Sequence, residues 1–111
     1  MFQRRTEEVT HAHRLTPRIY QLLLMTKTAR NGDERSNLTE LEERLQLGKS
    51  TVTELVLRAE KRGLVRRELD RERGRGISVL LTPTGARRLA AVAAELGDER
   101  KRLIDILQRF T

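Results

Sequence analysis

The residues best suited to chemistry lie between positions 49 and 75, and most are hydroxyl or cationic side chains. A segment with helical periodicity carries eight candidate contact residues, namely Lys49, Ser50, Thr51, Thr53, Glu54, Leu57, Arg58 and Lys61. A loop further along the chain carries Arg71, Arg73 and Arg75. Guanidinium groups suit phosphate oxygens and guanine edges, and hydroxyls can contact either bases or phosphates. These residue types therefore predict binding to double-stranded DNA.

The charge distribution favours the same class of partner. The formal net charge is +7, and residues 58–75 alone hold eight Lys or Arg against four Asp or Glu. A basic balance of this size indicates a polyanion, either nucleic acid or an acidic membrane surface. An ordinary solvated charged face is the alternative that charge alone leaves open.

Other kinds of chemistry find little support in the composition. The chain has no cysteine, which excludes disulfides, thiol nucleophiles and Cys-ligated zinc. His11 and His13 have no carboxylate at clear ligand spacing, and no nucleophile–base grouping is apparent. We expect no metal, no cofactor and no enzymatic activity.

The sequence also lacks the signals of a membrane or secreted protein. No segment approaches the ~18 apolar residues of a membrane span, and no apolar run follows the N-terminal charges as it would in a signal peptide. We expect a cytoplasmic protein with no membrane partner.

Three helices are expected to position the first set of residues, over residues 17–30, 38–46 and 49–62. Thr16 and Pro17 form an N-cap and first-turn pair, and Asn37 with Glu40 forms a capping box. Gly63 follows the third helix, where a left-handed C-terminal residue is favoured. The third helix carries one apolar stripe, made of Val52, Leu55, Val56 and Ala59. That stripe should be buried, which leaves the opposite face free.

A hairpin and a long helix follow. Residues 64–69 and 77–81 have strand patterns, and the charged, glycine-containing segment 70–76 joins them. Thr82-Pro83 predicts the start of the last helix, and Gly97-Asp98 is the candidate position for a kink or a break. The last helix carries an apolar stripe at heptad spacing, to which we assign dimerisation: Leu89, Val92, Leu96, Leu103, Ile106 and Phe110. The alternative is that this stripe folds back on its own domain.

The expected fold is mainly α with a β-hairpin wing, that is, a winged helix-turn-helix DNA-binding domain with a C-terminal dimerisation helix. Residues 1–14 form a short N-terminal segment, in which Phe2, Val9 and Ala12 give only a weak helical pattern. Residues 15–82 form the DNA-binding domain, and residues 83–111 form the helical dimerisation region.

Residues 15–95 resemble the MarR family of transcriptional regulators. The motifs that carry the resemblance are Leu38–Leu45 (LTELEERL), Lys49–Thr53 (KSTVT), Glu60–Arg67 (EKRGLVRR), Asp70, Arg75 and Leu81–Gly85 (LTPTG). The resemblance implies a homodimeric repressor or activator that binds a palindromic operator. It also implies that a small-molecule effector could release the DNA, as in many members; the sequence identifies no such effector.

The chain departs from the family pattern at several positions. Glu42 stands where the family usually has Ala, and Arg73 stands where an acidic residue usually orients the wing arginine. On the third helix, Glu54 and Leu57 replace residues that are usually more basic or polar. About 14 residues precede the first firm helix, so we expect a short variant with a truncated N-terminal helix.

The two unusual residues of the third helix leave alternatives open. Glu54 could accept from a cytosine amino group or could repel phosphate, and Leu57 could contact a thymine methyl or form an apolar docking patch. The predicted function is a dimeric repressor that reads a palindromic operator through helix 49–62 in the major groove and wing 70–76 in the minor groove. A winged-helix protein–protein interaction module and a non-specific DNA-binding protein are the alternatives.

Overall fold

The computed structural model describes residues 2–30, 32, 34–70 and 76–109, and within these ranges it describes side chains outside residues 2–6, 70, 98–107 and 109. The chain contains five helices and three strands over this part. In chain order they are α1 (Phe2–Ala12), α2 (Pro17–Lys27), β1 (Arg35–Asn37), α3 (Leu38–Leu45), α4 (Lys49–Lys61), β2 (Val65–Asp70), β3 (Gly76–Leu81) and α5 (Pro83–Arg109).

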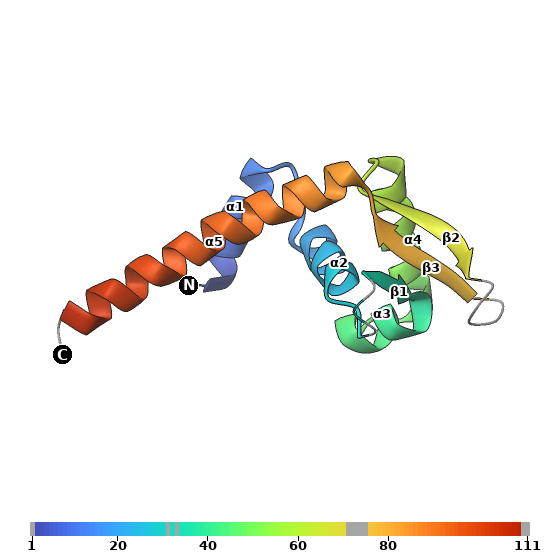
Figure 1. Ribbon diagram of the computed structural model, residues 1–111, viewed down its shortest axis with the longest axis horizontal. Coiled ribbons are helices and arrows are strands. Elements are labelled where there is room, and N and C mark those ends of the chain that lie inside the picture. Colours follow the sequence, from blue (N-terminus) through green and yellow to red (C-terminus); the bar gives the residue numbers. More distant parts are fainter. Residues whose placement is uncertain (1, 31, 33, 71–75, 110–111) are drawn as a thin grey trace.

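Helices α2, α3 and α4 and the sheet form one lobe, from which α5 extends as a long rod with α1 beside it (Figure 1). The molecule measures 55 × 26 × 26 Å along its principal axes. The prediction of a mainly helical chain with a β-hairpin is confirmed. No helix in the part of the chain that the structure describes is both long enough and apolar enough to cross a bilayer.

The predicted N-caps at Thr16 and Asn37 are confirmed, but the capping box is not completed, because the carboxylate of Glu40 accepts from Ser36 and from the N–H of Arg30. The N–H of Ile19 donates to Oγ1 of Thr16 at 3.1 Å, and the N–H of Glu40 donates to Oδ1 of Asn37 at 2.7 Å. Gly63 follows α4 with a φ of +74°, in the region that favours glycine. These local signals fix the ends of the helices that carry the candidate contact residues.

The sheet has the strand order β1-β3-β2, and all its pairs are antiparallel. The predicted hairpin is confirmed, with a register that runs from Val65 opposite Leu81 to Asp70 opposite Gly76. Strand β1 was not predicted. Its three residues, Arg35–Asn37, show no apolar alternation, and they pair only because the fold brings them to the free edge of β3.

The core forms under the α4 stripe, as predicted. Val52 and Ala59 are fully buried, and Leu55 and Val56 are nearly so. Helix α2 contributes a second layer of aliphatic side chains, made of Ile19, Leu22 and Leu23. Burying large aliphatic groups stabilises the fold by roughly 1.5–3 kcal/mol each.

The assignment of Leu89 and Val92 to a dimer surface was wrong. Leu89 is 5% exposed and Val92 is 0% exposed in the single chain, and Leu96 packs partly buried against the same core. Helices α1 and α2 pack against this side of α5 and cover its apolar stripe. The alternative, in which the stripe folds back on its own domain, therefore holds for these residues. The side chains of Leu103, Ile106 and Phe110 lie outside the described residues.

The N-terminal segment is a regular helix. Val9 of α1 is 1% exposed and belongs to the main core, and Thr10 beside it is fully buried. Helix α5 continues through Gly97 to Arg109 without the break considered at Gly97-Asp98. A single glycine lowers helix stability, but the residues on both sides of it continue the helix.

The Thr-Pro-x-Gly segment joins the hairpin to α5 by a close backbone contact. Oγ1 of Thr82 donates to the carbonyl oxygen of Gly63 at 2.5 Å and accepts from the N–H of Gly85 at 3.0 Å. A Cβ on Gly85 would overlap the carbonyl group of Leu64. Only glycine allows α5 to start against the hairpin at this distance.

Candidate nucleic-acid interface

The predicted contact residues of α4 lie together at the surface. All eight are exposed except Thr53, which is half-buried, and they occupy the face away from the core. Leu57 is 44% exposed among them. The periodicity that buries Val52 and Ala59 thus places a largely polar face on the outside of α4.

A tight turn presents this helix. Gln46 ends α3 in the left-handed conformation, with a φ of 54°, and the N–H of Leu47 donates to the carbonyl oxygen of Glu42 at 3.2 Å. Gly48 is the N-cap of α4 and supplies no capping side chain. The first amides of α4 therefore face outward beside Lys49, an arrangement that suits a phosphate group.

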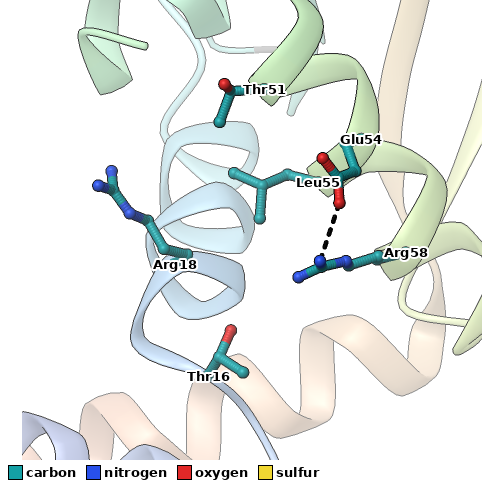
Figure 2. A pocket seen from close by; sticks show the side chains of 6 residues that line it. All are labelled: Thr16, Arg18, Thr51, Glu54, Leu55 and Arg58. Carbon is teal, nitrogen blue, oxygen red and sulfur yellow. Dashed lines mark hydrogen bonds and ion pairs between the residues drawn. The ribbon is translucent and has the colours of Figure 1, made fainter.

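An exposed ion pair lies along α4. Nη2 of Arg58 donates to Oε1 of Glu54 at 2.8 Å, one helical turn away. This pair borders a surface cavity that α4 forms with the start of α2 (Figure 2). The volume of the cavity is about 300 Å³. The cavity is lined by Thr16, Arg18, Thr51, Glu54, Leu55 and Arg58. The negative charge of Glu54 on this face is thus balanced by a neighbour on the same helix.

Acidic side chains tie the base of the hairpin to its surroundings. Both carboxylate oxygens of Glu60 accept from Nε of Arg67, at 3.1 and 3.2 Å, which connects α4 to β2. Glu68 pairs with Arg35 of β1 at 3.2 Å and with Arg66 at 3.1 Å. The pairs Glu60–Arg67 and Arg35–Glu68 were not predicted, because their partners belong to different elements and show no periodic spacing.

The wing begins and ends on a strand pair. Its strands β2 and β3 reach Asp70 and Gly76, which pair with each other. The predicted contact residues of the wing tip, Arg71, Arg73 and Arg75, lie outside the described residues.

A buried carboxylate supports the helix pair from behind. Glu40 is 9% exposed, and its oxygens accept from Oγ of Ser36 at 2.7 Å and from the backbone N–H of Arg30 at 2.8 Å. Arg44 donates to the carbonyl oxygens of Met25 and Thr28 at the end of α2. These bonds hold α3 against the preceding loop, which sets the position of the turn into α4.

Glu42, His11 and His13, which the sequence singled out, do not belong to the candidate interface. Glu42 is half-buried and has no ion pair within the described ranges. His11 is exposed, whereas Nε2 of His13 lies 2.8 Å from Oε2 of Glu95 and joins the α1–α2 loop to α5. Among the described residues, no three His, Asp or Glu side chains are grouped as metal ligands would be.

Two short helices joined by a tight turn, followed by an antiparallel hairpin, define a winged helix-turn-helix. A profile of the MarR family matches residues 15–76, which is more than half of the chain. The chain therefore belongs to the MarR family of DNA-binding transcriptional regulators.

Solved structures show the same fold over almost the whole chain. AbsC from Streptomyces coelicolor, a MarR family transcriptional regulator, is 25% identical with a TM-score of 0.81, covering 95% of this chain and 70% of AbsC. YusO from Bacillus subtilis is 23% identical with a TM-score of 0.79, covering 95% and 72%. A mutant of MepR from Staphylococcus aureus, bound to an oligodeoxyribonucleotide, is 16% identical with a TM-score of 0.80, covering 94% and 74%. A search of curated proteins gives no match.

Proposed function

We propose that this protein is a homodimeric, sequence-specific repressor that binds a palindromic operator. Helix α4 enters the major groove, and the wing at residues 70–76 contacts the minor groove. The observation that carries the proposal is the outward polar face of α4, bounded by a hairpin whose base is held to that helix by Glu60 and Arg67. A fixed angle between a reading helix and a wing suits simultaneous contacts in neighbouring grooves.

The contact residues divide by the chemistry of their side chains. Ser50, Thr53, Glu54 and Leu57 lie on the outermost face of α4 and suit base edges, whereas Lys49 and Lys61 at its ends suit phosphates. The wing arginines suit a narrow minor groove, where the negative potential is high. MepR, which shares the fold, is recorded with bound DNA, and this supports the same mode for the present chain.

We assign dimerisation to the part of α5 beyond Leu96, because the side chains of Leu89 and Val92 are already buried in the core of a single subunit. This part of the helix extends away from the lobe (Figure 1). Paired subunits would present two copies of α4 about one DNA helical turn apart, as a palindrome requires. We further propose that the protein acts in the cytoplasm; a small-molecule effector remains an expectation from the family, and no effector is assigned.

The experiment that tests this function is selection from a random duplex library, followed by titration of the enriched duplex with size analysis of the complex. We expect a palindromic consensus with half-sites about one helical turn apart, bound by two chains. Enrichment of no sequence, with weak binding to every duplex, would instead support the non-specific alternative.

A second candidate function is a protein-interaction module, favoured by two exposed large apolar side chains, Leu57 at 44% and Leu69 at 69%. The variant Leu57→Ala separates the two functions. For a DNA reader we expect less than about a tenfold loss of operator affinity, since one thymine-methyl contact is removed. For an interaction module, the wild type selects no DNA and the same variant abolishes binding of the protein partner.

A further inference from the structure

Glu54 and Arg58 form an exposed ion pair on α4. Their side chains are 65% and 62% exposed, and a single hydrogen bond of 2.8 Å joins Nη2 of Arg58 to Oε1 of Glu54 (Figure 2). Glu54 lies on the exposed side of α4, opposite the buried Val52, and its carboxylate borders the surface cavity that α4 forms with the start of α2 (Figure 2). A carboxylate at this place faces the floor of a groove when α4 enters it.

The pair retains hydrogen-bonding capacity on both partners. Oε2 of Glu54 has no partner among the described residues, and a guanidinium carries five N–H donors, of which Arg58 uses one here. The other acids near this face differ. Both oxygens of Glu60 bind Arg67, and the two oxygens of Glu68 bind Arg35 and Arg66. Compared with these two acids, Glu54 can still accept a hydrogen bond from a ligand.

We propose that Glu54 and Arg58 act as one unit that reads a single C·G base pair in each half-site. The proposal rests on the proposed function, since it requires α4 to lie in a major groove. In that groove a C·G pair presents the cytosine 4-amino donor beside two acceptors, guanine O6 and N7. The ion pair presents the matching order, a free carboxylate oxygen beside free guanidinium donors.

Electrostatics favour base reading over contact with the backbone for Glu54. Its carboxylate repels phosphates, so at the groove edge it would lower affinity for all sequences alike. At the groove floor it meets an amino group, and Arg58 keeps its charge balanced as water is excluded. An A·T pair has only one acceptor on each side of its amino donor, so it cannot accept two neighbouring guanidinium donors as guanine O6 and N7 do. The unit therefore contributes specificity for C·G.

The test compares duplex selection by the wild type, Glu54→Gln and the control Glu43→Gln. Glu43 lies on α3, outside the outward face of α4, and its Oε2 is 3.1 Å from Nη1 of Arg30 in a similarly exposed ion pair. The control therefore removes the same charge from a comparable pair. We expect Glu54→Gln to reduce the preference for C at one position of each half-site by about tenfold, with the rest of the consensus kept. Glu43→Gln should keep the wild-type consensus at every position.

Modified bases test the contact atom by atom. Replacing that cytosine by an analogue without the 4-amino group should weaken binding of the wild type about tenfold and have a smaller effect on Glu54→Gln, whose neutral amide oxygen is a weaker acceptor than a carboxylate. Replacing its partner by 7-deazaguanine should weaken binding of the wild type and have a smaller effect on Arg58→Gln.

The outcomes separate the inference from the function on which it rests. If the wild type selects no sequence, the proposed function fails. If the wild type selects a palindrome and Glu54→Gln selects the same palindrome with the same preference for C, the regulator stands and the reading unit is refuted. The reading unit would also be refuted if the operator position whose preference changes in Glu54→Gln were selected as A, and not as C, by the wild type.

Discussion

At Gly85 the backbone of α5 packs directly on the backbone of the hairpin. The space that a Cβ would need is occupied by the carbonyl group of Leu64, and this atom cannot move aside as a flexible side chain could. Thr82 makes two hydrogen bonds at the same junction, so the position of the hairpin relative to α5 depends on these few atoms.

Gly85→Ala should therefore lower the free energy of unfolding by about 3 kcal/mol, because the new methyl group forces the hairpin away from α5. Urea denaturation followed by circular dichroism measures this change. The matched control is Gly97→Ala in the same helix, where nothing lies within 4 Å of the added Cβ. It should stabilise the protein by roughly 0.5–1 kcal/mol through helix propensity. Equal effects of the two substitutions would contradict the close contact at Gly85.

Helix α1 shows how an element with a weak sequence pattern can belong to the core. Val9 is 1% exposed, and the hydrogen bond between His13 and Glu95 joins the following loop to α5. Together these contacts cover the side of α5 that contains Leu89 and Val92. Helix α1 thus acts as the cover of the α5 stripe within one chain, and dimerisation has to use other parts of α5.

Val9→Ala should cost about 1–2 kcal/mol of stability, since it removes two buried methyl groups and leaves a small cavity under α1. Thermal and urea unfolding would both report the loss. The substitution His11→Ala, at an exposed position of the same helix, should change stability by less than about 0.5 kcal/mol. A neutral Val9→Ala would mean that α1 does not pack on the lobe in solution.

For the whole molecule, the net charge of +7 and the exposed Lys49, Arg58 and Lys61 of α4 predict that DNA binding depends steeply on salt concentration. Each phosphate neutralised on duplex DNA contributes about −0.9 to the slope of log affinity against log salt. A dimer that makes about six to ten such contacts should lose roughly 10³–10⁵ in operator affinity between about 50 and 200 mM salt. Fluorescence anisotropy with a labelled operator measures the slope.

Substitutions at the surface provide the internal comparison for this measurement. Lys49→Gln at the start of α4 should reduce the slope by about one unit for each half-site, because one phosphate contact is lost. Arg87→Gln, at an exposed position of α5 that belongs to neither α4 nor the hairpin strands, should leave the slope unchanged. A slope near zero for the wild type would contradict a phosphate-binding role for this face.

The sequence by itself determined the helices and the hairpin that carry the candidate site. Thr16, Asn37 and Gly63 mark helix ends through hydrogen bonds or backbone conformations that involve only near neighbours, so these ends are readable without the fold. The period of α4 likewise separates its buried residues from its outward residues. The face that contains Glu54 and Arg58 was therefore predictable, although its role in DNA binding stays a proposal.

Only the tertiary structure decided which surfaces meet. An apolar stripe has the same pattern whether its own chain or a partner covers it, so the sequence could not show that Leu89 and Val92 serve the core of one subunit. Strand β1 and the Glu60–Arg67 pair depend on partners in other elements and leave no periodic signal. Local hydrogen bonds and side-chain periodicity are encoded over a few residues, whereas coverage of a face depends on the path of the whole chain.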